Sequence, residues 1–129
     1  MLLLIVGGVA GTLARYYIGQ WFARHHLTER FPWGTFAINV SGSFLLAFFV
    51  VLILERLPAE HHHWYLLLGV GFCGAYTTFS TFELETFQLI QKGHWGYALA
   101  YVLGSVFSGF VGVLLGMGLG HWVFPKQPL

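Results

Sequence analysis

Long apolar segments alternate with short polar connectors along the chain. Residues 31–54 and 93–125 each contain no Lys, Arg, Asp or Glu. Runs of about 18 or more apolar residues are typical of helices that cross a bilayer. A soluble protein of this length would not need two such runs to form its core. We therefore predict membrane-spanning helices over about residues 2–23, 34–54, 64–90 and 96–122, forming one all-α transmembrane domain over residues 1–129.

The aromatic residues and the composition support this prediction. Tryptophan gathers at membrane–water interfaces, and all five tryptophans lie at ends of the predicted segments: Trp21, Trp33, Trp64, Trp95 and Trp122. Only 9% of the residues are charged, against roughly 25% in soluble domains. The first segment lacks the basic start and cleavage site of a signal peptide, so we expect it to be retained. A net charge of +1 argues against nucleic-acid binding.

Charges in the connectors bear on the orientation of the chain. Four spans put both termini on one side, which carries Arg56 and Lys126, while the other side carries Arg24, Arg30 and Lys92. The cytoplasmic side of a membrane protein normally has an excess of Lys and Arg. Two against three is almost no excess, so the charges permit insertion in both directions and hence an antiparallel dimer. A modest bias towards one orientation is the alternative.

The third segment contains an interruption. Residues 74–78 read Gly-Ala-Tyr-Thr-Thr within an otherwise apolar span. Hydrocarbon offers no partner for a freed backbone group, so a break at this depth is tolerated only inside protein or beside a water-filled path. We therefore expect a broken third helix and a candidate ion or substrate site at the break.

Polar side chains form stripes on two other segments. Thr35, Asn39 and Ser43 recur every four residues, and Tyr101 and Ser105 do so on the fourth segment. Hydroxyls often bond back to their own helix, which is the simplest explanation of the stripes. An asparagine amide needs another partner in hydrocarbon, so we expect the Asn39 face to line a polar path or a helix contact.

The segment after the interruption combines aromatic, hydroxyl and acidic residues. Phe79 and Phe82 share a helix face near Ser80 and Thr81. The positive edge of an aromatic ring can hold a small anion weakly, as conduction requires, although lipid or core contact is the common role of such a pair. Glu85 shares the face of these hydroxyls. A carboxylate deep in a membrane is functional, unless the segment is shifted and the carboxylate lies near its end.

Three further features leave alternatives open. Arg15 lies about four turns into the first segment, where it either snorkels to the interface or attracts anions in a vestibule. Small residues spaced four apart form ridges that pack within one chain or at a subunit interface: Gly7, Gly11, Gly104, Ser108, Gly112, Gly116 and Gly120. The clustered histidines at residues 25–26 and 61–63 fit solvated loops better than a zinc site.

Three blocks of the sequence resemble signature blocks of the Fluc (CrcB) fluoride channels. They are residues 7–16, 34–39 and 71–82, the last reading Gly-Phe-Cys-Gly-Ala-Tyr-Thr-Thr-Phe-Ser-Thr-Phe. The blocks fall in the family's order and in matching segments, spread across nearly the whole chain. One departure is Ala75-Tyr76, where the family often has a second glycine; it leaves the carbonyl positions of the break in place.

The resemblance implies a function and an assembly. Members are not enzymes but channels of the bacterial plasma (inner) membrane, which export fluoride passively and so lower its toxicity. They form antiparallel, dual-topology homodimers in membrane lipid, with two pores and a broken third helix. Backbone carbonyls matching Gly74 and Thr77 of both subunits hold a central sodium ion.

The resemblance also assigns roles in the pore. Residues matching Phe79 and Phe82 line it, and the asparagine matching Asn39 donates a hydrogen bond nearby. The remaining matches form a polar track and an arginine at the pore entrance: Ser80, Thr81, Glu85, Tyr101, Ser105 and Arg15.

Two other classes fit a short four-span protein. A dual-topology small multidrug or cation transporter needs a glutamate in its first helix, but the first segment here has Arg15, which repels cations. The other class is a membrane assembly subunit without transport. The residues themselves do not distinguish fluoride from chloride; only the resemblance names fluoride.

Overall fold

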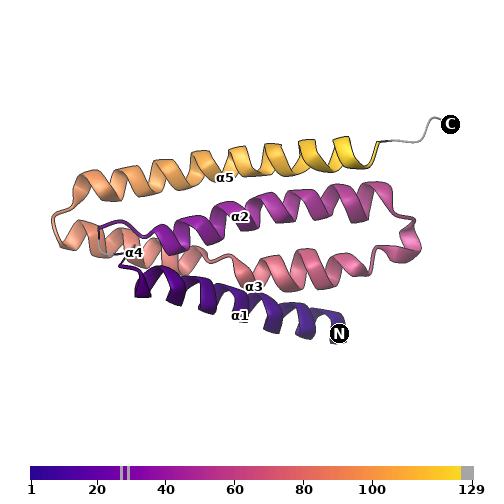
Figure 1. Cartoon of the computed structure of the whole chain (residues 1–129), viewed down its shortest axis with the longest axis horizontal. Helices are drawn as coiled ribbons and strands as arrows, with labels where there is room; N and C mark the ends of the chain where they lie inside the picture. Colours follow the sequence, from indigo (N-terminus) through magenta and orange to yellow (C-terminus); the bar gives the residue numbers. More distant parts are fainter. Residues whose placement is uncertain (27, 29, 126–129) are drawn as a thin grey trace.

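Helices make up almost all of the structure, a computed structural model that describes residues 1–26, 28 and 30–125. Figure 1 shows an elongated bundle in which the start of α1 and the end of α5 lie at the same end. The first half contains α1 (Leu2–Arg24) and α2 (Trp33–Phe49), and α2 continues through the π-helical segment η1 (Val50–Arg56).

The second half begins with a short 3₁₀ turn, η2 (Ala59–His61), in the connector. The third span then consists of the π-helical η3 (Leu66–Cys73), the single turn α3 (Gly74–Tyr76) and α4 (Phe79–Gln91). The fourth span is one continuous helix, α5 (Trp95–Val123).

Four stretches of the described chain are long and apolar enough to cross a membrane: Leu2–Arg24, Trp33–Arg56, Ala59–Gln91 and Trp95–Val123. The residues that the structure describes contain no strand. The prediction of an all-α, multi-pass membrane protein with four spans is therefore confirmed. Lys126, which entered the charge count, lies outside the described residues.

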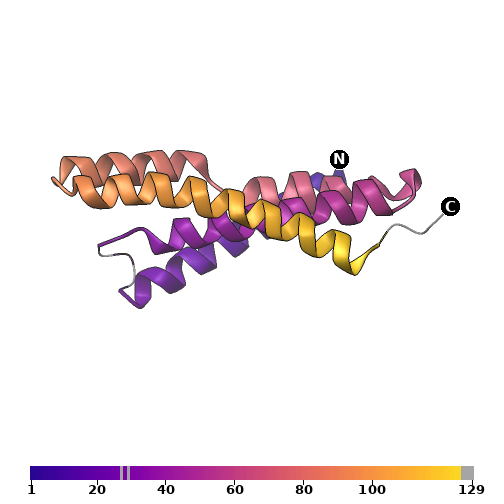
Figure 2. The same cartoon turned by 90° about the horizontal axis from the view of Figure 1, so that it is seen from above.

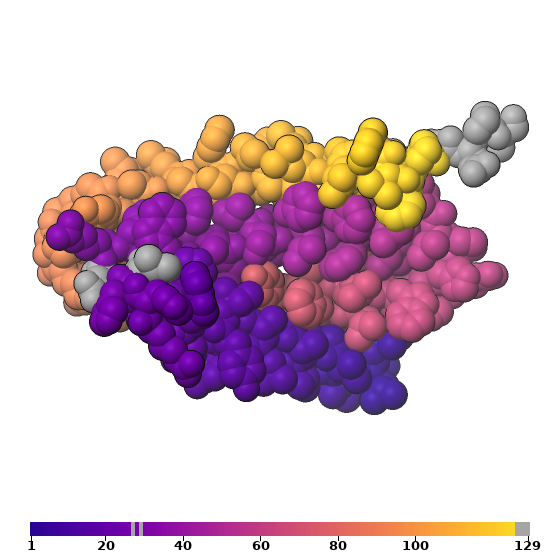
Figure 3. Space-filling view, viewed as in Figure 1, coloured from indigo at the N-terminus to yellow at the C-terminus, as the bar shows by residue number. Residues whose placement is uncertain are grey.

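Glycines allow the helices to approach closely. The absent side chain of Gly116 on α5 leaves room for the Phe44 carbonyl of α2, and Gly11 on α1 does the same for the Phe72 carbonyl of η3. A methyl group at either glycine would collide with backbone. Both small-residue ridges thus pack within one chain. Figure 3 shows the result, with α2 between α5 and the third span and α1 along the other side.

The third span leaves helical geometry at Thr77 and Thr78. Thr77 has φ −76° and ψ 158°, and Thr78 has φ −150° and ψ 115°, which are extended conformations. Helical structure resumes at Phe79. Figure 2 shows the resulting offset between α4 and the part of the span before it. Two residues of extended backbone therefore lie inside a predicted span.

The histidine-rich connectors bond mainly to nearby backbone. Ring nitrogens of His25, His62 and His63 lie 2.7, 3.1 and 2.7 Å from the carbonyl oxygens of Trp21, Leu57 and Glu60. The described residues contain no group of three or more His, Cys, Asp or Glu placed to hold a metal. In the part of the chain that the structure describes, His25, His62 and His63 therefore bond to backbone carbonyls in or next to their own connectors.

Candidate functional site

The side chain of Asn39 on α2 holds the interruption of the third span. Its Nδ2 donates to the carbonyl oxygen of Thr78 over 3.0 Å, and the Thr78 N–H donates to its Oδ1 over 2.8 Å. One amide therefore satisfies both backbone groups of a residue that has left the helix. The amide nitrogen of Asn39 has a second N–H that this pair does not use.

Diverting these donors releases two carbonyl oxygens of the break. In an α-helix the Gly74 carbonyl would accept from the Thr78 N–H and the Thr77 carbonyl from the Thr81 N–H. Here Thr78 donates to Asn39 instead, and Thr81 donates to the hydroxyl of Thr78 over 3.3 Å. Gly74 itself is exposed, with open space beside its Cα.

Arg15 of α1 is directed at this break. Its Nη1 donates to the Thr77 carbonyl oxygen over 3.4 Å, and the contact is partly buried. On the other side, the Thr77 methyl group occupies the space left by Gly42 of α2. The hydroxyl and N–H of Thr77 both donate to the Cys73 carbonyl, over 3.0 and 3.1 Å. Thr77 is thus held from three sides.

Thr78 caps the first turn of α4. Its hydroxyl accepts from the Thr81 N–H and donates to the Thr81 Oγ1 over 2.9 Å. Ser80 and Thr81 are exposed on this turn. The amino end of a helix carries a partial positive charge and unsatisfied N–H groups, which favour anions. The break therefore places an anion-attracting helix end within a span.

Further along α4, Glu85 joins three helices. Its Oε1 accepts from the Thr35 hydroxyl of α2 over 2.9 Å, and its Oε2 accepts from the Tyr101 hydroxyl of α5 over 2.7 Å. Tyr101 is completely buried, and Phe82 packs edge-on against its ring with centroids 5.0 Å apart. The structure thus links Thr35, Glu85, Tyr101 and Phe82 through successive contacts.

The two phenylalanines differ in their surroundings. Their ring centroids lie 5.9 Å apart, as expected for one helix face, but Phe79 is 73% exposed and Phe82 only 8%. Phe82 belongs to the core between α4 and α5. Phe79 stands at the surface of the single chain, where only lipid or another subunit can cover it.

Two grooves meet at the break. One, of about 440 Å³, runs along α1 and α4 and is lined by Arg15, Tyr16, Gly19, Gln20, Thr35, Ile38, Thr78, Ser80, Thr81 and Glu85. The other is lined by Asn39, Gly42, Ser43, Leu46, Gly69, Cys73, Gly74, Thr77, Thr78 and Phe79. Thr78 lines both. Polar and aromatic groups from three spans therefore line the two grooves on either side of the break.

Some polar side chains of the predicted stripes form hydrogen bonds to another helix, and others bond to their own helix. Ser43 donates to its own helix at the Asn39 carbonyl over 2.8 Å, whereas Thr35 and Asn39 both reach the third span. The hydroxyl of Ser105 is buried and has no hydrogen-bond partner among the residues that the structure describes. Sequence reasoning missed the Ser41 hydroxyl, 2.9 Å from the Tyr76 hydroxyl, because Ser41 lies off the polar stripe.

Comparison with known proteins places the chain in a family. The family model described as "CrcB-like protein, Camphor Resistance (CrcB)" matches residues 2–117. A protein of Acidobacterium capsulatum named "Fluoride-specific ion channel FluC" is 44% identical over 119 residues, covering 90% of this chain and 91% of that protein. A Solibacter usitatus protein of the same name is 45% identical over 115 residues, covering 89% and 93%. The chain belongs to the CrcB-like protein family.

Proposed function

We propose that this chain is a fluoride-selective channel that exports fluoride passively across the bacterial plasma membrane. Relatives that align over about nine-tenths of its length carry the name of such a channel. The observation that carries the proposal is the break at Thr77 and Thr78, where hydrogen-bond donors and a helix amino end meet an open groove. The function is transport rather than catalysis.

The chemistry of the groove suits fluoride. Fluoride is small, strongly hydrated and a good hydrogen-bond acceptor, so it needs donors when it loses water. The groove along α1 and α4 offers the hydroxyls of Ser80 and Thr81 and the start of α4, and Asn39, which has a second N–H, lines the other groove. The ring edges of Phe79 and Phe82 add weak sites. Several weak sites allow an ion to leave again, as conduction requires.

The polar track continues beyond the phenylalanines in this proposal. The ion enters near Arg15, passes Ser80 and Thr81, and approaches Thr35, Glu85 and Tyr101. The unpartnered hydroxyl of Ser105 serves as a further donor on α5. Among the described residues no lysine lies within the four spans, so no ring of buried lysines would trap the anion.

The complete pore requires a second subunit. In each span only 11% to 28% of the most apolar stretch is buried within the chain, and Phe79 and Gly74 are exposed beside the break. A surface of this kind faces either lipid or another copy. We infer an antiparallel homodimer with two pores, in which the partner covers Phe79. The near balance of Lys and Arg between the two sides supports insertion in both orientations.

The released carbonyls fit a structural sodium ion at the dimer interface. The oxygens of Gly74 and Thr77 have lost their usual helical donors, and carbonyl oxygens suit a hard cation. Thr77 bonds to Arg15 over 3.4 Å, but a carbonyl has two lone pairs, so one remains. A bound sodium ion would fix the break and link the subunits. Side chains of this chain, not the ion, would contact fluoride.

Fluoride efflux from liposomes tests this function. Purified protein is reconstituted with internal potassium fluoride, and valinomycin removes the membrane potential. We expect fast fluoride release without a pH gradient and little chloride release. Equal chloride release would refute the selectivity, and proton-coupled uptake of cationic drugs would favour a multidrug transporter. The α1 helix of this chain has no acid for proton exchange and carries Arg15 instead, which argues against such a transporter.

A further inference from the structure

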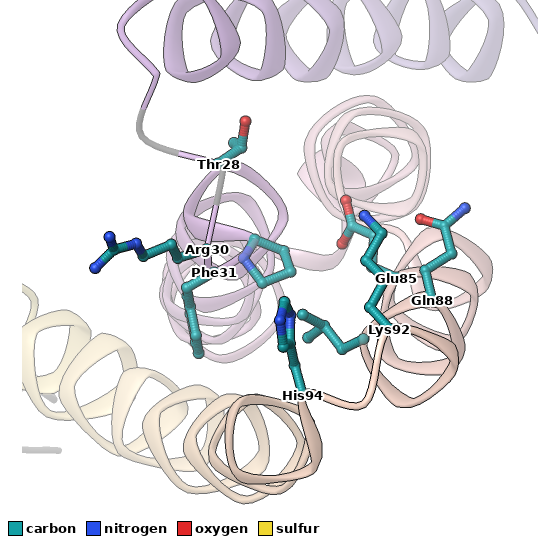
Figure 4. A pocket seen from close by; sticks show the side chains of 9 residues that line it. Thr28, Arg30, Phe31, Glu85, Gln88, Lys92 and His94 are labelled. Carbon is teal, nitrogen blue, oxygen red and sulfur yellow. The ribbon is translucent and has the colours of Figure 1, made fainter.

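A second cavity lies at the connector end of the bundle. It has a volume of about 150 Å³ and opens between the segment before α2, the end of α4 and the start of α5 (Figure 4). The charged or ionisable residues that line it are Arg30, Lys92, His94 and Glu85. Nothing in the proposed path described above uses the first three of these.

The turn between α4 and α5 fixes two of these side chains at the cavity. Gly93 has φ +76°, and the N–H groups of Gly93 and His94 donate to the carbonyls of Ile90 and Leu89 over 2.9 Å each. This pair of bonds is a Schellman motif, which ends a helix in a defined geometry. Lys92 and His94 flank the glycine, so the turn determines where both leave the backbone.

The side chains differ in direction. In Figure 4, Lys92 and His94 point into the cavity, whereas the guanidinium of Arg30 points away from Glu85. Lys92 is exposed to solvent. Its ammonium group is therefore the positive charge best placed to meet an ion arriving at this cavity from water.

Glu85 connects this cavity to the proposed path. It lines both the cavity and the groove that contains Arg15, Ser80 and Thr81. A carboxylate at such a junction repels an approaching anion, and a nearby cation offsets that repulsion. A positive mouth with low-dielectric walls also raises the local concentration of anions.

We propose that this cavity is a mouth of the anion path, a site for small hydrated anions in which Lys92 attracts the ion and offsets the charge of Glu85. The inference rests on the proposed function, because it needs an anion that passes Glu85. The small volume suits a hydrated monatomic anion. An anionic lipid headgroup is the competing occupant, and the experiment distinguishes the two.

The test compares the variant Lys92→Gln with wild type in the fluoride efflux assay at low and high ionic strength. Arg24→Gln is the matched control, because Arg24 is exposed and on the same side of the membrane but does not line the cavity. Both variants change the Lys and Arg balance of that side equally, so an effect on insertion would appear in both. Lys92→Arg keeps the charge and should retain the wild-type rate.

Electrostatic attraction gives a specific salt dependence. With about 10 mM salt, where the screening length is about 30 Å, we expect Lys92→Gln to slow efflux severalfold. With about 1 M potassium glutamate, where it is about 3 Å, the difference from wild type should vanish. The effect should be the same in vesicles of phosphatidylcholine alone and in vesicles that also contain phosphatidylglycerol.

Several results would overturn the inference. One is equal rates for Lys92→Gln and Arg24→Gln at low salt; another is a difference that persists at high salt. An effect confined to vesicles with phosphatidylglycerol would assign the cavity to a lipid headgroup. Absence of fluoride efflux in the wild type would instead refute the proposed function, so the two failures are distinguishable.

Discussion

Replacing Asn39 with alanine removes both hydrogen bonds that hold Thr78 in its extended conformation. The bonds measure 3.0 and 2.8 Å, and Thr78 is buried. Its N–H and carbonyl would be left without partners inside a membrane span. Hydrogen bonds between membrane helices contribute about 0.6 kcal/mol on average and up to about 1.7 kcal/mol. Two bonds to one buried residue therefore correspond to about 1–3 kcal/mol.

Loss of these two hydrogen bonds should lower both the stability of the protein and its rate of fluoride transport. We expect Asn39→Ala to lower the thermal stability of the protein in detergent and to slow fluoride efflux from liposomes by roughly fivefold to a hundredfold, since about 1.4 kcal/mol corresponds to a factor of ten. Ser43→Ala is the matched control. Ser43 lies one turn further along α2, and its hydroxyl donates back to its own helix at the Asn39 carbonyl.

A second substitution separates the two hydrogen bonds. Asn39→Asp keeps an acceptor for the Thr78 N–H but loses the donor to the Thr78 carbonyl and adds negative charge beside the groove. We expect it to fold better than Asn39→Ala and to conduct poorly. If Asn39→Ala matched Ser43→Ala in both stability and efflux, the reasoning that this amide holds the break would be wrong.

Three further predictions concern the pore, the topology and the cation. The double variant Phe79→Ile, Phe82→Ile keeps apolar bulk but removes the ring edges, so efflux should fall while size-exclusion chromatography still shows a dimer. Unchanged efflux would show that both side chains serve only in packing. Single cysteines at each terminus, introduced after replacing Cys73, should react with an impermeant reagent from both sides of the membrane, and labelling from one side alone would exclude dual insertion. Refolding in a large organic cation instead of sodium should weaken the dimer, because an ion bound by both subunits stabilises it through mass action; an unchanged dimer and unchanged efflux would remove sodium from the account.

The sequence was sufficient to predict the four helical spans, and the placement of the site stays a prediction. Uninterrupted apolar runs predict the four spans, and glycine followed by threonines indicates the place where the third span leaves helical geometry at Thr77 and Thr78. The four-residue spacing of Thr35 and Asn39 correctly indicates a face with polar contacts, since both side chains reach the third span.

The partners of these residues were not predictable, because they depend on tertiary packing. No local pattern indicates that Asn39 bonds to the backbone of Thr78, or that Glu85 meets both Thr35 and Tyr101. Phe79 and Phe82 share a face by spacing alone, yet packing of α5 buries only Phe82. Helical spacing tells which residues share a face but not which helix covers that face.

The most direct test of the central claim is the reversal potential of currents through the purified protein in a planar bilayer. With a fluoride gradient and equal chloride on both sides, we expect the reversal potential to follow the fluoride equilibrium potential. With a chloride gradient and equal fluoride, it should remain at zero. A reversal potential that follows chloride or a cation, or an absence of current in fluoride with protein that is dimeric and folded, would contradict the proposal that this chain is a fluoride-selective channel.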